Sequence, residues 1–266
     1  MNRIQLLLAS AFFLWSCQGK VANENQTKST LEFQNKGHEL VYQMTQKVGS
    51  YQDLLDLKDV VYTYTYQTAD QKEDISTEKY IFDGEWSYGS YEKHERTLPD
   101  MEGTIEQGYN GQSFWLKHNG ERVEDEAAIK RVTFNRKTNF YWFAMFQKLL
   151  DPGLIYTYMD EATVNGQVYD LVEVSFDTDQ PSDLYRLYIN KETQLVDQFL
   201  FTVVDFNVTD PLIMKVEYEK VDNILIPSKR KYTKANWDGE NLTDNWTQVQ
   251  WTGIKFNNNL PKQLFE

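Results

Sequence analysis

The chain has 266 residues, and its 27 basic and 40 acidic side chains give a net charge of −13 at neutral pH. A field of that sign repels nucleic acid and anionic lipid surfaces, so we expect neither as a direct partner. The single cysteine excludes an internal disulfide, and the length is sufficient for one large hydrophobic core or two small ones. Aromatic residues make up 15% of the chain and include 17 tyrosines, a composition that favours strands.

Residues 1–16 have the pattern of an export signal. Arg3 precedes an apolar run of roughly 12 residues, which is too short to span a bilayer. The run ends in Leu14-Trp15-Ser16-Cys17, which resembles the lipobox of bacterial lipoproteins. The resemblance implies cleavage before Cys17 and attachment of acyl chains such as palmitate to that cysteine. The alternative is an ordinary cleaved signal with a chance cysteine, and both predict that the chain leaves the cytoplasm.

Residues 17–30 are polar and lack an apolar period, so they predict a lipidated, flexible tether. Gln18 follows Cys17, where an Asp would retain a lipoprotein at the inner membrane, and the tether has no acidic cluster. The lipoprotein resemblance therefore implies an anchor in the outer membrane that faces the periplasm. Two lipid chains are sufficient for stable anchoring without help from charge.

The first predicted element of the domain is a helix that ends at Gly49. Its apolar residues recur close to the 3.6-residue period: Phe33, Leu40, Val41, Met44 and Val48. The pattern then changes to period two at residues 60–66, where Tyr62, Tyr64 and Tyr66 share one face of a strand. Further strands are predicted at residues 79–82, 85–91, 104–109 and 112–117, the last two joined by an Asn110-Gly111 hairpin turn.

A second helix is predicted at residues 124–150, before Asp151-Pro152-Gly153. Its second half, NFYWFAMFQKLL, is apolar on nearly all sides and contains Phe140, Phe143 and Phe146. A helix of that kind must be enclosed by other elements. It is too short to cross a membrane.

The remaining pattern is almost entirely of strands joined by short turns. The predicted strands are residues 155–164, 167–176, 184–189, 194–204, 212–221, 224–237 and 241–256. Successive hairpins predict one large, curved antiparallel sheet. The predicted fold is therefore mainly β with helices, an incomplete barrel over residues 31–266 that encloses the N-terminal helix and the internal aromatic helix.

This order of elements resembles the lipoprotein-localisation proteins LolA and LolB. The resemblance rests on the opening helix that runs into residues 51–54, the strand at Val60, the hairpin at residues 110–116, the internal helix and the closing strands with residues 221–227. It implies an incomplete barrel with internal helices as a lid over a hydrophobic cavity. The implied ligands are the acyl chains of lipids or lipoproteins. We expect the protein to be a monomer.

No pattern for catalysis or for a cofactor is present in the sequence. His38, His94 and His118 are scattered without a second ligand at metal spacing, so solvated positions are expected for them. Gly-x-Ser-x-Gly and glycine-rich phosphate loops are absent from the sequence. We therefore expect no enzyme, although a glycosidase-type carboxylate pair would be invisible in sequence.

The aromatic residues predict a ligand cavity, although packing alone is the commoner role of such stripes. A large curved sheet offers more concave apolar surface than two helices can fill. The predicted cavity residues are Tyr62, Tyr64, Tyr66, Trp86, Phe140, Phe143 and Phe146. The second hypothesis is a glycan-binding accessory lipoprotein with Trp237, Trp246 and Trp251 in an exposed row, and the third is a lipoprotein that binds only protein partners.

Overall fold

The computed structural model describes residues 32–266. Within them, Phe33–Glu266 form one compact unit. The predicted export signal at residues 1–16, the lipidation site Cys17 and the tether at residues 17–30 lie outside the described residues.

The described chain forms one open antiparallel sheet of thirteen strands, which confirms the predicted mainly-β fold. The spatial order is β6-β5-β4-β3-β2-β1-β13-β12-β11-β10-β9-β8-β7, so the chain builds two meanders that meet where β1 pairs with β13. The strands are β1 Asp59–Gln67, β2 Glu73–Ile81, β3 Trp86–His94, β4 Ile105–Tyr109, β5 Phe114–His118, β6 Glu121–Val123, β7 Leu154–Val164, β8 Gln167–Phe176, β9 Tyr185–Asn190, β10 Val196–Val203, β11 Val208–Val221, β12 Ile224–Lys234 and β13 Thr247–Phe256.

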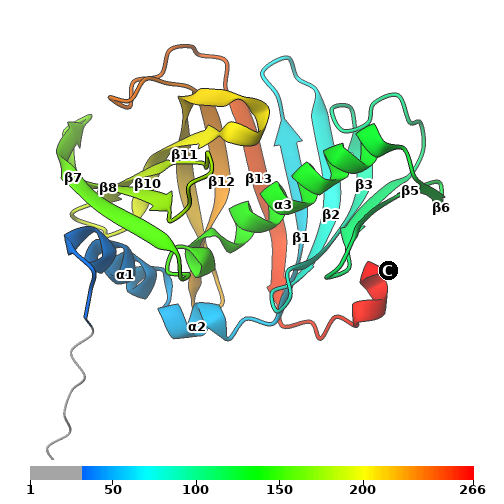
Figure 1. Cartoon of the computed structure of the whole chain (residues 1–266), viewed down its shortest axis with the longest axis horizontal. Coiled ribbons are helices and arrows are strands. Elements are labelled where there is room, and N and C mark those ends of the chain that lie inside the picture. Colours follow the sequence, from blue (N-terminus) through cyan, green and yellow to red (C-terminus); the bar gives the residue numbers. More distant parts are fainter. Residues whose placement is uncertain (1–31) are drawn as a thin grey trace, which may run out of the picture. The chain divides into compact units, whose positions relative to one another are not determined.

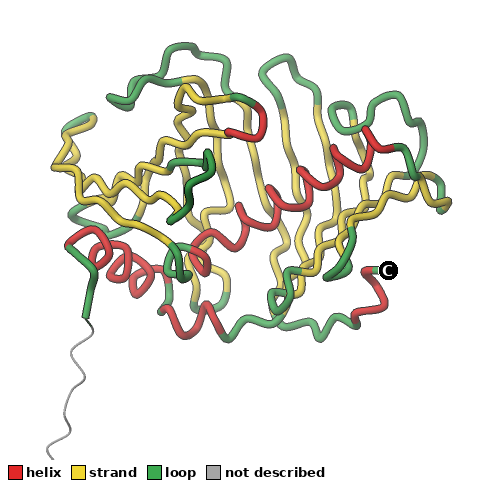
Figure 2. Tube along the Cα trace, in the orientation of Figure 1, coloured by secondary structure: helices red, strands yellow, loops and turns green. Residues whose placement is uncertain are grey.

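Helix α3 (Glu126–Lys148) follows edge strand β6 and precedes the opposite edge strand β7. It therefore crosses the whole sheet, and Figure 1 shows it running obliquely over the concave face. The same crossing is visible in Figure 2, where the edges of the sheet curl toward the helix. Helices α1 (Lys36–Val48) and α2 (Tyr51–Leu55) precede β1, and short 3-10 helices occur at η1 (Val204–Phe206) and η2 (Lys262–Phe265).

Helices α1 and α3 begin at residues whose side chains cap the helix N-terminus. The side chain of Asn35 caps α1 by accepting from the backbone N–H of His38, and Asp125 caps α3 by accepting from Ala128 N–H. Both satisfy a backbone donor that the first helical turn leaves free. Helix α1 packs against β7, β8 and β12, so the sheet holds one helix near an edge and one across its middle.

Strand β2 begins earlier than the pattern predicts, at Glu73 instead of Lys79. The inward positions of this early segment are polar: Asp74, Ser76 and Glu78 are each no more than 1% exposed. Asp74 and Glu78 have partners outside β2, and Ser76 donates to Glu78, so alternation of apolar residues could not reveal the strand. Strand β6 was likewise not predicted, and β13 begins at Thr247 rather than at residue 241.

Most of the core lies between the concave face and helices α1 and α3. It joins Val41 and Met44 of α1 to Phe143 of α3 and to inward residues of the sheet such as Leu187 and Met214. A smaller cluster lies on the outward face, where Tyr188, Leu200 and Ile213 pack with residues of the β12–β13 connection. No helix within residues 32–266 is both long enough and apolar enough to cross a bilayer.

Candidate functional site

The aromatic interior beneath α3 contains six of the seven predicted cavity residues. Those from β1 are Tyr62, Tyr64 and Tyr66, and those from α3 are Phe140, Phe143 and Phe146; none is more than 9% exposed. The ring of Tyr62 stacks on that of Phe143 with centroids 4.6 Å apart. Two predicted elements separated by about eighty residues therefore meet face to face, as the sheet and helix patterns require.

Trp86 lies elsewhere. It precedes the inward residues Ser87 and Gly89, so its side chain points to the outward face of β3. There it packs edge to face with Phe265 of η2, at 6.1 Å between ring centroids. Its assignment to the cavity is wrong, because alternation groups residues by face but does not say which face is inside.

The interior continues beyond the predicted residues along the C-terminal meander. Trp251 of β13 lies 5.0 Å from Phe143 and 5.7 Å from Tyr62 between ring centroids. Phe199, Phe201 and Met214 extend the same buried surface. The glycan-binding hypothesis requires Trp251 in an exposed row with Trp237 and Trp246, but Trp251 is only 1% exposed. That row does not form, since Trp246 lies on the outward face beside Lys215 and Lys231.

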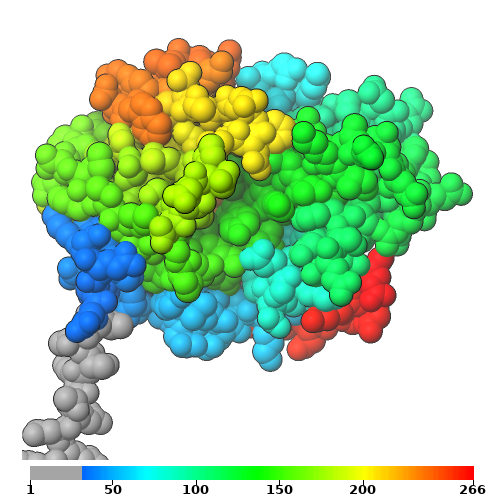
Figure 3. Space-filling view, in the orientation of Figure 1, coloured from blue at the N-terminus to red at the C-terminus, as the bar shows by residue number. Residues whose placement is uncertain are grey.

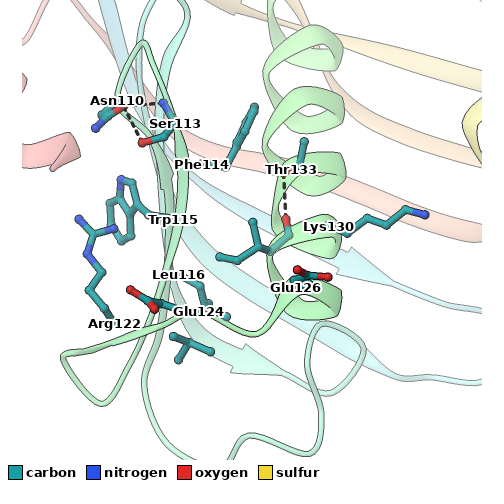
Figure 4. Close-up of a pocket in the computed structure, with 12 residues that line it drawn as sticks. Asn110, Ser113, Phe114, Trp115, Leu116, Arg122, Glu124, Glu126, Lys130 and Thr133 are labelled. Atoms are coloured by element: carbon teal, nitrogen blue, oxygen red, sulfur yellow. Dashed lines mark hydrogen bonds between the residues drawn. The ribbon is translucent and has the colours of Figure 1, made fainter.

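Two grooves occur in the described chain. They have volumes of about 720 and 370 Å³, and neither is lined by the predicted aromatic residues. The larger one lies between β5 and the first half of α3, with Phe114 and Leu116 on one side and Lys130 and Thr133 on the other (Figure 4). An occupant of the aromatic interior must therefore displace side chains of α3.

The second half of α3 is enclosed, but less completely than predicted. Phe143 and Ala144 are buried, whereas Tyr141 is 46% exposed. Figure 3 shows this helix at the front surface, with a hollow between it and the yellow residues near η1. Phe206 of η1, which is itself exposed, contacts Phe134 of α3 at 4.1 Å between ring centroids. The second half of the helix thus reaches the surface at Tyr141, and its buried side covers the interior.

A buried ion pair joins the first half of α3 to β2. Nη1 of Arg136 donates to Glu78 at 2.7 Å and Nη2 donates at 3.1 Å, and both side chains are fully buried. Ser76 and Tyr80 donate their hydroxyls to the same carboxylate at 2.7 and 2.9 Å. Although burial disfavours the charged guanidinium, Glu78 keeps the pKa of Arg136 well above its ordinary value.

Gly89 makes room for this pair. It lies between Glu78 of β2 and Gln107 of β4 in the strand register, directly under the guanidinium. A Cβ at this position would come within 2.6 Å of Nη1 of Arg136. Glycine is therefore required here for space.

The described residues show no grouping suited to metal binding. No three His, Cys, Asp or Glu side chains in residues 32–266 are placed to hold a metal ion. His38 is partly exposed and stacks on Tyr156 at 4.7 Å between ring centroids, and partial burial lowers its pKa. His94 and His118 bond to backbone carbonyls of the 97–103 loop.

Solved structures share this architecture. A DUF1329 family protein from Desulfovibrio piger aligns with a TM-score of 0.52 at 13% identity, covering 87% of this chain and 98% of its own. A LolA superfamily protein from Nitrosomonas europaea aligns at 0.50 and 12% identity, covering 86% and 96%. An outer membrane lipoprotein-sorting protein domain from Vibrio parahaemolyticus aligns at 0.50 and 11% identity, covering 87% and 96%.

These likenesses define the class of fold. The chain has a LolA-like fold, as its order of elements predicts. No protein-family model matches the sequence. No curated protein matches it either.

Proposed function

We propose that this protein is a lipid-anchored periplasmic carrier that holds an acyl chain, or the acylated end of a lipoprotein, between its sheet and the second half of α3. The observation that carries the proposal is the apolar interior beneath an aromatic helix that reaches the surface at Tyr141. The fold is also that of a lipoprotein-sorting protein domain. Anchoring through Cys17 in the outer membrane, and a monomeric state, belong to the same proposal.

The energetics of displacement favour a long chain. Burying an acyl chain is favourable by about 0.8 kcal/mol per CH₂. Exposing a buried Phe side chain costs about 1.5–3 kcal/mol. A chain of about 16 carbons therefore offsets the exposure of Phe140, Phe143 and Phe146 and leaves a net gain.

The two halves of α3 have different attachments. The first half is tied to β2 by the buried pair of Arg136 and Glu78. The second half is held by ring packing, by hydrogen bonds such as Gln147 Nε2 to Leu54 C=O at 2.7 Å, and by a partly exposed ion pair of Lys148 with Glu85 at 2.6 Å. We infer that the second half is the part that moves aside, with the first half as its fixed end.

Quenching by brominated fatty acids tests this function. The protein carrying Cys17→Ser is purified without detergent and titrated with dibromostearate, which quenches the emission of tryptophans that it contacts. We expect saturable quenching that falls sharply in Trp251→Phe. The control is Trp86→Phe, which removes an outward tryptophan and should leave the quenched fraction unchanged. Native mass spectrometry of the same sample should show co-purified lipid.

Two outcomes would replace the proposal. Absence of saturable acyl binding together with binding of soluble glycans would favour the glycan hypothesis, although the tryptophan row on which it depended is not formed. Failure of both ligands would leave binding to protein partners. The anchor is tested separately: Cys17→Ser should abolish incorporation of labelled palmitate and release the protein from membranes.

A further inference from the structure

One buried arginine lacks an acidic partner. Three other arginines, two of them partly exposed, pair with carboxylates at 3.1 Å or less: Arg96 with Asp74, Arg136 with Glu78, and Arg186 with Glu173. Arg230 of β12 is only 3% exposed, and the hydrogen bonds of its guanidinium in the described chain go to backbone carbonyls. It is therefore a buried charge without a counter-ion among the described residues.

The contacts of Arg230 place it at the centre of the aromatic interior. Its Nε donates to Pro227 C=O and its Nη2 to Trp142 C=O of α3, both at 2.9 Å. The guanidinium lies 4.2 Å from the ring centre of Trp251. Its Nη1 and the Nε1 of Trp251 are both buried, and neither has a partner in the described chain. Two buried donors on these stacked side chains thus remain without acceptors.

The groups around Arg230 do not neutralise it. Burial lowers its pKa to about 10, so it remains charged at neutral pH. The titratable side chains that act on it are the phenols Tyr218, Tyr64 and Tyr62. Burial in turn raises the pKa of each of these phenols, which keeps them neutral. An unpaired charge in such surroundings costs several kcal/mol unless an anion joins it.

We propose that Arg230, with the indole N–H of Trp251, binds the anionic head of a single-chain lipid, a carboxylate or a phosphate, so that the acyl ligand enters head first. This inference rests on the proposed acyl-binding function and specifies the ligand class of the same site. A guanidinium presents donors that match the oxygens of both anions. Arg136 cannot serve in this way, because Glu78 already occupies its Nη1 and Nη2 donors.

Binding constants for matched ligands test the proposal in the Cys17→Ser protein. Dodecanoate, dodecyl phosphate and methyl dodecanoate compete against a bound fluorescent fatty acid. We expect at least one of the two anions to bind tenfold or more tightly than the ester, and the tighter anion identifies the head group. In Arg230→Met this preference should disappear while ester binding persists. Lys229→Met, on the outward face of the same strand, should leave the preference unchanged.

A second measurement keeps Arg230 and Trp251 unchanged. It therefore gives the orientation of the bound ligand even if Arg230→Met does not fold. Dodecanoate brominated beside the carboxylate should quench Trp251-dependent emission more strongly than dodecanoate brominated at the far end. The opposite order overturns the proposal, as does equal binding of acid, phosphate and ester. Failure of all three ligands, the ester included, would instead overturn the proposed function itself.

Discussion

The two halves of the sheet present different inner faces to the same helix. In the half built from β2–β6, the inward positions beneath α3 include Ser76, Glu78, Ser87 and Gln107, all no more than 1% exposed. In the half built from β1 and β7–β13, the corresponding surface is made of residues such as Tyr62, Leu187 and Met214. The helix matches this division, with Asn135 and Arg136 over the first half and Phe143 and Phe146 over the second.

The two halves therefore have different roles: the polar half fixes the position of α3, and the apolar half forms the interior that α3 covers. A buried ion pair with further hydrogen bonds has one favourable geometry, because each partner left alone is costly. Apolar side chains have no such directional requirement and tolerate replacement by another apolar surface. The polar half therefore sets where α3 lies, and the apolar half is where an acyl chain can take its place.

Alkaline pH is expected to have the largest effect, because it disrupts both halves together. Burial raises the pKa of Tyr62 and Tyr80 well above 10, and it raises the pKa of Tyr88 and Tyr156 to about 12. The unfolded chain ionises its phenols near pH 10, so the stability that these groups contribute is complete below pH 10. It is lost as the pH rises from 10 through 12. Melting temperatures measured from pH 8 to 12 should fall steeply in that window, and a flat profile would contradict the burial of these phenols.

Glu78→Gln should have the largest effect of a single substitution in the polar half. It leaves the guanidinium of Arg136 charged, buried and without a carboxylate, which costs about 3–5 kcal/mol of unfolding free energy. Urea denaturation measures this loss. The matched control is Glu217→Gln, which breaks an exposed pair with Lys229 at 3.7 Å and should cost about 1 kcal/mol or less. Similar losses in the two variants would remove the distinction between the halves.

Gly89→Ala tests the space around the same pair. The added methyl would lie within 2.6 Å of the guanidinium, so the ion pair must shift, at a cost of about 1–3 kcal/mol. The control is Ser90→Ala, one residue along β3 on the outward face. We expect the control to unfold at nearly the wild-type urea concentration. An unchanged midpoint for Gly89→Ala would mean that α3 is not fixed where the structure places it.

The apolar half and the order of elements were accessible from the sequence. Tyr62, Tyr64 and Tyr66 alternate along β1, and Phe140 and Phe143 recur on one side of α3, so each pattern indicated its own buried face. The polar half was not accessible, because Glu78 and Arg136 are 58 residues apart and each resembles a surface residue in its local pattern.

Arg230 and the orientation of the tryptophans were missed for a related reason. In β12, Arg230 occupies an inward position between Lys229 and Lys231, and a row of three cations is typical of a solvated strand. Trp251 alternates regularly, but alternation is equally consistent with either face being inside. The side that is buried follows only from the path of α3 across the sheet, which no local segment encodes.

Ile189→Val is expected to have the smallest effect on the free energy of unfolding. It changes side-chain volume in the apolar half, as Gly89→Ala does in the polar half. It removes one methylene from the apolar half, at a position that is 3% exposed. The expected loss is about 0.5–1.5 kcal/mol, because neighbouring apolar side chains close part of the space. Since an acyl chain replaces apolar surface with apolar surface, dodecanoate should bind Ile189→Val and wild type within a factor of about three, which corresponds to less than about 1 kcal/mol. A tenfold loss of binding would mean that the apolar half requires a shape as specific as that of the polar half, and α3 would then not act as a displaceable cover.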